Sequence, residues 1–312
     1  MWRYLFTRIL DTVPTAVLVL TLVFVALRLL PGDPAVAALG ELARPDQLQR
    51  FREDLGLNRP LPEQYVRFLW QVAHADFGRS MANNVPIGAL LRTNLPYTME
   101  LTLAATVIAI AIGIPIGILS AIRRNEGIDY AGRLVALIGF SMPDFYLGAL
   151  LLIVFAVALG WFPIMGGGEG GLAARLHHLF LPALTLGLIK AAFLTRLTRS
   201  AMLEVLHRSY IRTGRSKGLP ERTVLYRHAL RNALLPVVTG LGIYMLTTLS
   251  GSITVELVFT RPGLGKLLVG AISSRDYALV QAGLVVFALF VVLVNLMVDL
   301  AYAAIDPRIT YT

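Results

Sequence analysis

Apolar residues along this 312-residue chain come in runs of about 20, which is the length of a helix that crosses a bilayer. The runs are Thr12–Leu30, Leu101–Ile122, Leu134–Leu159, Leu179–Leu197, Ala233–Val255 and Tyr277–Val298. Arg28 interrupts the first run, and Asp144, beside Pro143, interrupts the third. Lys190 and Arg196 lie within the fourth. The pattern predicts an all-α integral membrane protein with about six transmembrane helices.

Composition agrees with this prediction. Hydrophobic residues make up 56% of the chain and charged residues only 15%, against roughly 25% in an ordinary globular domain. The first run could also be a signal peptide, with a basic start at Arg3 and Arg8 and a cleavage site at Ala35-Val36-Ala37. It exceeds the roughly 7 to 15 residues of a signal core, which favours an uncleaved first helix.

Charge between the runs predicts the orientation. Ten Lys or Arg lie from Lys190 to Arg231, against two Glu, and further arginines precede the first run and follow the second. By the positive-inside rule these segments and both termini face the cytoplasm. The segment 31–98 is charge-balanced, with seven Arg and seven Asp or Glu, and is expected outside.

The chain is therefore expected to have three parts. Residues 1–30 form the amino terminus and first helix, and residues 31–98 form a small external cap of short helices, one of them starting at Pro45-Asp46. Residues 99–312 form the transmembrane core, which includes a long cytoplasmic loop, 199–236.

Several functions are disfavoured by what the sequence lacks. It has no phosphate loop of the G-x-x-x-x-G-K-[ST] type, no H-E-x-x-H and no G-x-S-x-G, so no ATPase, zinc protease or hydrolase chemistry is expected of the chain itself. It has no cysteine, which excludes disulfides and thiolate metal sites. The net charge of +9 fits anchoring of membrane helices better than nucleic-acid binding, because the basic residues cluster between apolar runs. The adjacent His177 and His178 are expected to be structural.

The cytoplasmic loop 199–236 is far longer than the roughly 2 to 8 residues that join helices in a bundle. Arg208, Arg212 and Arg215 are spaced to share one helix face, with Tyr210, Thr213 and Lys217 beside them. Gly218 is expected to end this helix, and Leu219-Pro220-Glu221 to start another. Pro236 lies where the fifth span begins.

The loop has two interpretations. It could rest on anionic lipid headgroups as a basic amphipathic hairpin, or it could dock a cytoplasmic partner. A helix that inserts into lipid needs a continuous apolar face, and Tyr210-Ile211 is the only apolar contact before Gly218. This favours docking.

The loop resembles the cytoplasmic coupling loop of ABC importer permeases. Arg212-Thr213-Gly214 occupies the positions of that family's Glu-Ala-Ala motif, and Gly218 occupies the position of its glycine. Ala233-Leu234-Leu235-Pro236 corresponds to the segment that ends the family's motif. The missing acidic residue and the longer gap resemble the dipeptide/oligopeptide/nickel branch. Other segments resemble the same branch, namely Leu30-Pro31-Gly32-Asp33-Pro34, Leu55-Gly56-Leu57-Asn58-Arg59-Pro60-Leu61, Asp76-Phe77-Gly78-Arg79-Ser80, Ser141-Met142-Pro143-Asp144-Phe145, Pro262-Gly263-Leu264-Gly265, Arg275-Asp276-Tyr277 and Asp306-Pro307-Arg308.

The resemblance implies an inner-membrane subunit of a bacterial importer that forms half of a solute pathway. It implies a second, related permease subunit, two ATP-binding subunits and an external substrate-binding protein as partners. No cofactor is expected on this chain; ATP and Mg²⁺ are expected in the partner subunits. The implied docking residues are Arg208, Tyr210, Arg212, Thr213, Gly214, Arg215, Lys217, Gly218 and Leu219, with Leu235 and Pro236 at the end of the loop.

Polar residues within the spans are candidates for lining the pathway. A carboxylate in a span is costly unless it faces a cavity, which singles out Asp144 beside Pro143. The hydroxyls of Thr247, Thr248, Ser250 and Ser252 could line the pathway, or they could bond the carbonyls of their own helix. The expected solute is a dipeptide or oligopeptide, with nickel, glutathione or another small solute as the alternative. A self-powered secondary transporter is the alternative of another class.

Overall fold

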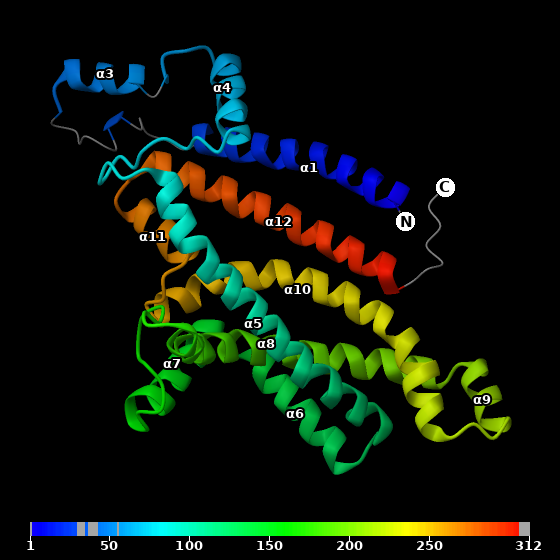
Figure 1. Ribbon diagram of the computed structural model, residues 1–312. Coiled ribbons are helices and arrows are strands. Elements are labelled where there is room, and N and C mark those ends of the chain that lie inside the picture. Colours follow the sequence, from blue (N-terminus) through cyan, green and yellow to red (C-terminus); the bar gives the residue numbers. More distant parts are fainter. Residues whose placement is uncertain (1, 30–34, 37–42, 55, 306–312) are drawn as a thin grey trace. The chain divides into compact units, whose positions relative to one another are not determined.

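The computed structural model describes residues 2–29, 35–36, 43–54 and 56–305, and within these ranges the chain forms helices and no β-strand (Figure 1). One isolated antiparallel bridge joins Arg79 and Pro86. The motif segments 30–34 and 306–308, and Ala37 of the candidate cleavage site, lie outside the described residues. The prediction of an all-α chain is confirmed.

The helices are numbered in the order in which they occur along the chain. They are α1 (Trp2–Leu29), α3 (Pro45–Asp54), α4 (Leu61–Ala73), α5 (Ile87–Ile122), α6 (Gly127–Ser141), α7 (Asp144–Leu151), the π-helix η1 (Leu152–Ala158), α8 (Leu172–Leu206), α9 (Ser209–Ser216), the π-helix η2 (Thr223–Leu230), α10 (Arg231–Val258), α11 (Leu264–Ser273) and α12 (Tyr277–Ile305).

Four segments are single helices long and apolar enough to cross a membrane. They are Leu10–Leu29, Ile87–Ile122, Leu172–Leu206 and Tyr277–Met297. Two more candidates are bent pairs, Gly127–Ser141 with Asp144–Ala158 at 105° and Thr223–Met245 with Thr247–Val258 at 44°. Counting each bent pair as one span makes up to six, in agreement with the prediction.

The third predicted span, Leu134–Leu159, differs from the structure in its bounds and its shape. The helical segment begins at Gly127 rather than Leu134, and the chain turns sharply between α6 and α7. Met142 and Pro143 both have extended backbone, with ψ of 130° and 143°. Proline disfavours the helical conformation at the residue before it and has no N–H to donate, so the helix ends there and a new one begins at Asp144.

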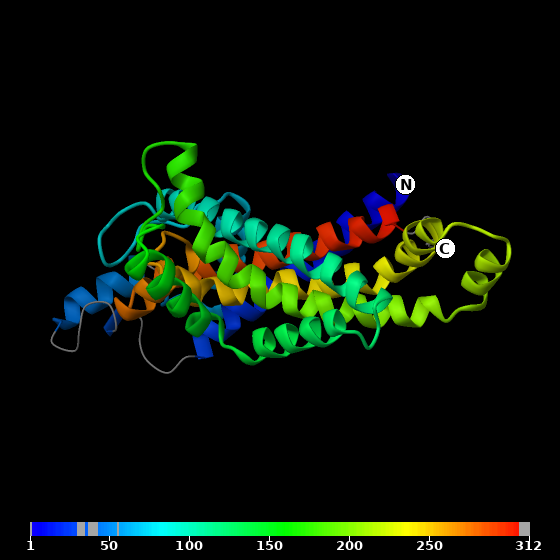
Figure 2. The same cartoon turned by 90° about the horizontal axis from the view of Figure 1, so that it is seen from below.

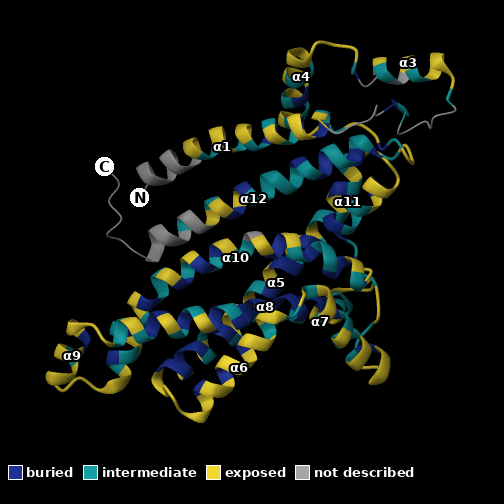
Figure 3. Ribbon diagram, turned by 180° about the vertical axis from the view of Figure 1, so that it is seen from behind, coloured by how far each residue is buried: buried dark blue, intermediate teal, exposed yellow. Residues whose placement is uncertain are grey.

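The fourth predicted span, Leu179–Leu197, is also longer in the structure. α8 runs over 35 residues, Leu172–Leu206, past both Lys190 and Arg196. Figure 3 shows it as the most buried of the helices around it, whereas α6 beside it is largely exposed. The predicted span already contained both of these charges. In the structure Lys190 is buried among protein side chains, whereas Arg196 is exposed.

The chain divides into two compact units, Met1–Pro96 with Gly263–Leu296, and Tyr97–Pro262 with Met297–Thr312. In the first unit, α4 packs on α1 through Phe24, whose ring lies 5.2 Å from that of Tyr65 and 5.5 Å from that of Phe68. Ser80 bonds to the Asp276 carboxylate, which also accepts a bond from the amide of Leu279 at 3.1 Å. Two motif segments, 76–80 and 275–277, are thus joined.

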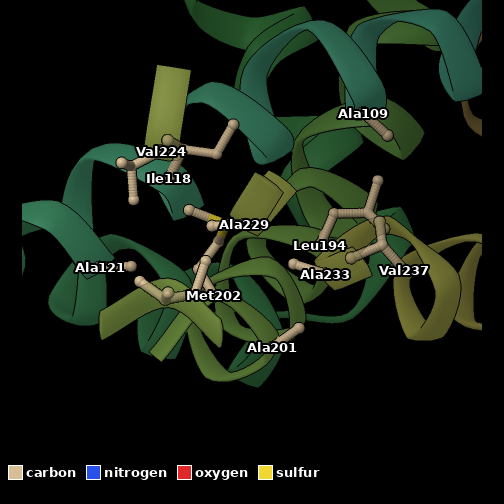
Figure 4. Close-up of a cluster of buried hydrophobic side chains, with 11 residues drawn as sticks. Ala109, Ile118, Ala121, Leu194, Ala201, Met202, Val224, Ala229, Ala233 and Val237 are labelled. Atoms are coloured by element: carbon tan, nitrogen blue, oxygen red, sulfur yellow. The ribbon is translucent and has the colours of Figure 1, made fainter. Parts of the chain in front are cut away.

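The second unit has a core at the end of the bundle that carries α9. Figure 4 shows its buried side chains, which come from α5, α8, η2 and α10. Ile211 of α9 belongs to the same cluster. The full set of buried residues is Ala109, Ile118, Ala121, Leu194, Ala201, Met202, Ile211, Val224, Ala229, Ala233 and Val237.

Candidate translocation pathway and docking loop

The segment between α8 and α10 is a helical hairpin, visible beyond the end of α8 in Figure 2. α9 ends where Gly218 adopts a left-handed conformation, with φ of 76°, and donates its N–H to Arg215 O at 2.9 Å. The amide of Leu219 reaches back to Gly214 O at 3.3 Å. These bonds satisfy carbonyls at the end of the helix, and glycine reaches that φ without steric cost. Gly218 therefore stops α9 as the sequence predicted.

Arg208 corrects the predicted basic face. It precedes α9, with an extended ψ of 148°, and its side chain pairs with Glu204 of α8. The face predicted to include Arg208 therefore starts one turn later. The reason is that α8 runs to Leu206 and the chain turns at 207–208. The prediction assumed one continuous helix, so residue spacing could not reveal this turn.

Arg215 connects the two arms of the hairpin. Its Nε and Nη2 donate to the Glu221 carboxylate at 3.1 and 2.6 Å. These hydrogen bonds with the Arg215 guanidinium hold the pKa of the Glu221 carboxyl below its usual value, so the pair is ionised at neutral pH. Both side chains are about half exposed, and the pair orders the hairpin more than it stabilises the fold.

The apolar side of α9 is already occupied by protein. Ile211 is 1% exposed and belongs to the core cluster. The Tyr210 hydroxyl accepts a bond from the Asn232 side chain at 3.1 Å. The residues that face outward are Arg212, Thr213, Arg215, Ser216, Lys217, Gly218 and Leu219.

A groove lies beside this exposed face. Its volume is about 460 Å³, and it has an apolar floor with four basic side chains around it. The lining residues are Ala121, Arg124, Leu203, Leu206, His207, Arg212 and Arg215. The loop thus presents a basic surface on a fixed support, and most of its predicted docking residues lie on that surface. Leu235 and Pro236 lie within α10 rather than at its start, since the helix begins at Arg231.

Asp144 lies at the break between α6 and α7, and the structure gives it two neighbours that the sequence did not link to it. A Cβ on Gly251 of α10 would lie 2.4 Å from Asp144 Oδ2, so the carboxylate occupies space that only glycine leaves open. Asp144 also acts electrostatically on Lys190 of α8. Lys190 is buried, with Nζ 5.1 Å from the centre of the Tyr244 ring. The break, the acid and the base thus come together in the second unit.

The predicted hydroxyl stretch divides into two sets. Thr248 and Ser252 are buried and bond carbonyls of their own helix, at 2.6 Å to Tyr244 O and 2.8 Å to Leu249 O. Thr247 and Ser250 are exposed, although the Thr247 hydroxyl also bonds Tyr244 O, at 3.0 Å. Of the four, only the exposed two are placed to meet something outside this chain.

Two charge clusters were missed by reasoning from the sequence. Asp129 at the start of α6 is fully buried and receives bonds from Arg199 of α8 at 2.6 and 2.8 Å and from the amide of Asn125 at 2.9 Å. At the other end of the unit, the Glu100 carboxylate forms ion pairs with Arg175 at 2.6 Å and with Arg261 at 3.3 Å. The sequence shows that Asp129 and Glu100 lie beside apolar runs. It could not identify the arginines that pair with them across the bundle, because these lie 70 or more residues away in the chain.

Metal ligation finds no support in the described part of the chain, where no group of three or more His, Asp or Glu side chains is placed to bind an ion. His177 and His178 each contact a backbone carbonyl, of Trp161 at 2.9 Å and of Ala174 at 2.8 Å. Their rings lie 6.4 Å apart.

Comparison with known proteins covers the whole chain. Residues 113–311 match the family described as "Binding-protein-dependent transport system inner membrane component", and residues 1–102 match its amino-terminal counterpart. The chain is 43% identical over 311 residues to the glutathione transport system permease protein GsiC of Pectobacterium atrosepticum, and 42% identical over 316 residues to the oligopeptide transport system permease protein AppB of Bacillus subtilis. Both alignments cover 100% of each chain.

The fold is also similar to that of solved transporters. A chain of the MetNI methionine ABC transporter in an inward-facing conformation aligns with a TM-score of 0.57 at 22% identity, covering 71% of this chain and 98% of that one. The matched helices, the family profiles and the full-length relatives agree. The chain belongs to the binding-protein-dependent transport system inner membrane component family and is a permease of an ABC importer.

Proposed function

We propose that this permease forms half of a translocation pathway for small peptides and is driven by ATP-hydrolysing subunits that dock on α9. The observation that carries the docking proposal is that Ile211, the aliphatic residue of α9, is buried in the protein core while the basic side of the helix is exposed. A helix that has already buried its apolar residue cannot insert into lipid, but it can present charge to another protein.

The core cluster supplies a route from the hairpin to the spans. Ile211, Val224 and Ala229 pack in one cluster with buried residues of α5, α8 and α10. Because packed interiors transmit displacement instead of absorbing it, a push on α9 would move the ends of these helices together. Closure of two ATP-binding subunits would in this way switch the pathway between its inward-open and outward-open states.

The remaining partners follow from the same proposal. A second, related permease subunit would complete the pathway, and an external substrate-binding protein would deliver the solute. Both termini and the hairpin would face the cytoplasm, and ATP and Mg²⁺ would be bound by the ATPase subunits. Asp144, Lys190 and the exposed Thr247 and Ser250 are the side chains we propose for the pathway.

Small peptides are proposed as substrates because relatives at 42–43% identity over the whole chain are named for oligopeptides and for glutathione, itself a tripeptide. Uptake of labelled glutathione and of labelled dipeptides and oligopeptides by cells with and without the transporter separates these substrates. Uptake of none of them would contradict the proposed substrate class.

Docking is tested by purifying the permease and measuring how much ATP-binding subunit accompanies it. The double variant Arg212→Glu/Arg215→Glu reverses the exposed charge and is expected to lose most of the bound subunit. Gly218→Pro is expected to do the same, because proline cannot adopt φ of 76° and would remove the bond to Arg215 O.

Arg92→Glu is the matched control, since Arg92 is exposed on α5 in the other unit, within the segment expected outside. It makes the same type of substitution at a single exposed position and is expected to leave the ATPase bound. Normal copurification and ATP-coupled uptake in the double variant would refute docking through α9.

A further inference from the structure

We propose that a cavity beneath α4, in the first unit, binds a phosphate group, and that a phospholipid headgroup of the bordering leaflet is the source that the chemistry of the cavity favours. The cavity has a volume of about 290 Å³, many times what one water molecule needs. It is formed by the end of α1, by residues 56–81 and by the first turns of α12.

Arg28 is one of the basic groups that line this cavity. It lies in the last turn of a span, where an unpaired charge is costly. Its guanidinium stacks 3.6 Å from the centre of the Phe24 ring, and its Nε donates to Gln64 Oε1 at 3.1 Å. A second nitrogen reaches Phe24 O at 3.4 Å, and no carboxylate of the described residues pairs with the charge. The side chain is therefore held in place by uncharged partners.

Two further arginines line the cavity. The Arg67 side chain reaches the turn at Gly56, with Nη1 3.2 Å from where a Cβ on that glycine would lie. Arg79 is fixed by a bond from its Nη1 to Asn84 O at 2.9 Å. Asp76 is the single acidic lining residue, and one of its oxygens accepts the amide of Gly78 at 3.3 Å. Three positive charges against one negative charge make a site for an anion.

The cavity is also lined by uncharged polar residues and by apolar residues. Gln71 and Gln281 add amide groups to the arginines, as donors to phosphate oxygens. Phe68, Ala282 and Val285 are buried and form an apolar wall. Arginine clusters recognise phosphate through charge-assisted bonds, and an apolar wall next to them suits the glycerol and first methylenes of a lipid. A free inorganic phosphate would not use that wall.

The test measures thermal stability of the purified transporter in micelles of a maltoside detergent, which carries no charge and no phosphate. Phosphatidylglycerol is added in one series and inorganic phosphate in another. A ligand that binds only the folded state raises Tm. We expect phosphatidylglycerol to raise the Tm of the wild type. The double variant Arg67→Gln/Arg79→Gln should need at least about tenfold more lipid for the same rise in Tm, since a hydrogen bond to a charged group contributes about a factor of ten to the binding constant.

Arg28 also packs on Phe24, so Arg28→Gln would disturb the fold as well as the cavity, and it is made as a separate variant. The double variant keeps Arg28 unchanged. Arg92→Gln, an exposed arginine of the same unit outside the cavity, is the control and is expected to respond as the wild type does. A rise with inorganic phosphate that the double variant loses would support the site with a free anion as its source. No rise with either ligand, or an equal rise in the wild type and the double variant, would overturn it.

Discussion

Asp129 shows at the scale of single residues how this permease keeps charge inside an apolar chain. Its carboxylate is fully buried and receives bonds from Arg199, from the Asn125 amide and, at 3.3 Å, from Arg133. A buried carboxylate without such partners would be costly. The pair joins the start of α6 to α8 close to where α8 leads into the docking hairpin, so it positions both helices.

Asp129→Asn should therefore destabilise the protein. It leaves the Arg199 guanidinium, whose side chain is 19% exposed, without a counter-charge. We expect a loss of about 3 kcal/mol, the lower end for breaking a buried pair because Arg199 is partly exposed. Thermal unfolding of the purified chain measures the loss as a lower Tm.

Glu126→Gln is the control for this prediction. Glu126 lies three residues earlier, and its side chain is exposed. It is expected to unfold at the wild-type temperature. If Asp129→Asn and Glu126→Gln unfolded at the same temperature, the buried ion pair would contribute little to stability.

At the scale of helices, α5 and α8 approach closely at two glycines one turn apart. A Cβ on Gly113 would lie 2.7 Å from Leu194 Cβ and 2.8 Å from Ala191 O, and one on Gly117 would lie 2.6 Å from Thr198 Cβ. Small residues spaced one turn apart on a helix allow a neighbouring helix to approach closely. A close approach of backbones leaves no flexible atom to move aside, so the contact depends on glycine.

Gly113→Ala and Gly117→Ala should each separate the two helices and cost about 1–3 kcal/mol, the range for overpacking a well-packed interior. Gly88→Ala on the same helix is the matched control, because nothing lies within 4 Å of its Cβ position; its stability should change by less than about 1 kcal/mol. Comparing the unfolding midpoints of the three variants with that of the wild type tests this prediction. Equal midpoints would mean that α5 and α8 can part without cost.

At the scale of the whole molecule, the basic loop 199–236 predicts the orientation of the permease in the membrane. The chain contains no cysteine, so single cysteines can be introduced without prior removal of others. Ser216→Cys on the hairpin and Ser274→Cys between α11 and α12 replace exposed serines. A membrane-impermeant maleimide should label Ser274→Cys in intact cells and Ser216→Cys only after permeabilisation.

The unchanged chain controls for background labelling, since it should not react in either condition. Labelling of Ser216→Cys in intact cells would place the hairpin outside. The proposed docking of ATPase subunits would then be untenable, because ATP is cytoplasmic.

The sequence by itself determined the number of spans, the all-helical fold, the family and the end of α9 at Gly218. Each of these depends on residues close together in the chain, such as apolar runs about as long as a bilayer is thick, or a glycine that ends a helix. The family resemblance likewise rests on contiguous motifs such as 210–218.

Tertiary structure decided which partner each buried charge has. Asp129 meets Arg199, and Arg261 meets Glu100, across 70 and more residues. It also decided which hydroxyls of α10 are buried, that α8 extends from Leu172 to Leu206, and that the third predicted span bends by 105°. The physical reason is that the cost of a charge or a hydroxyl depends on whether it faces lipid or protein, and that depends on the packing of segments distant in the chain.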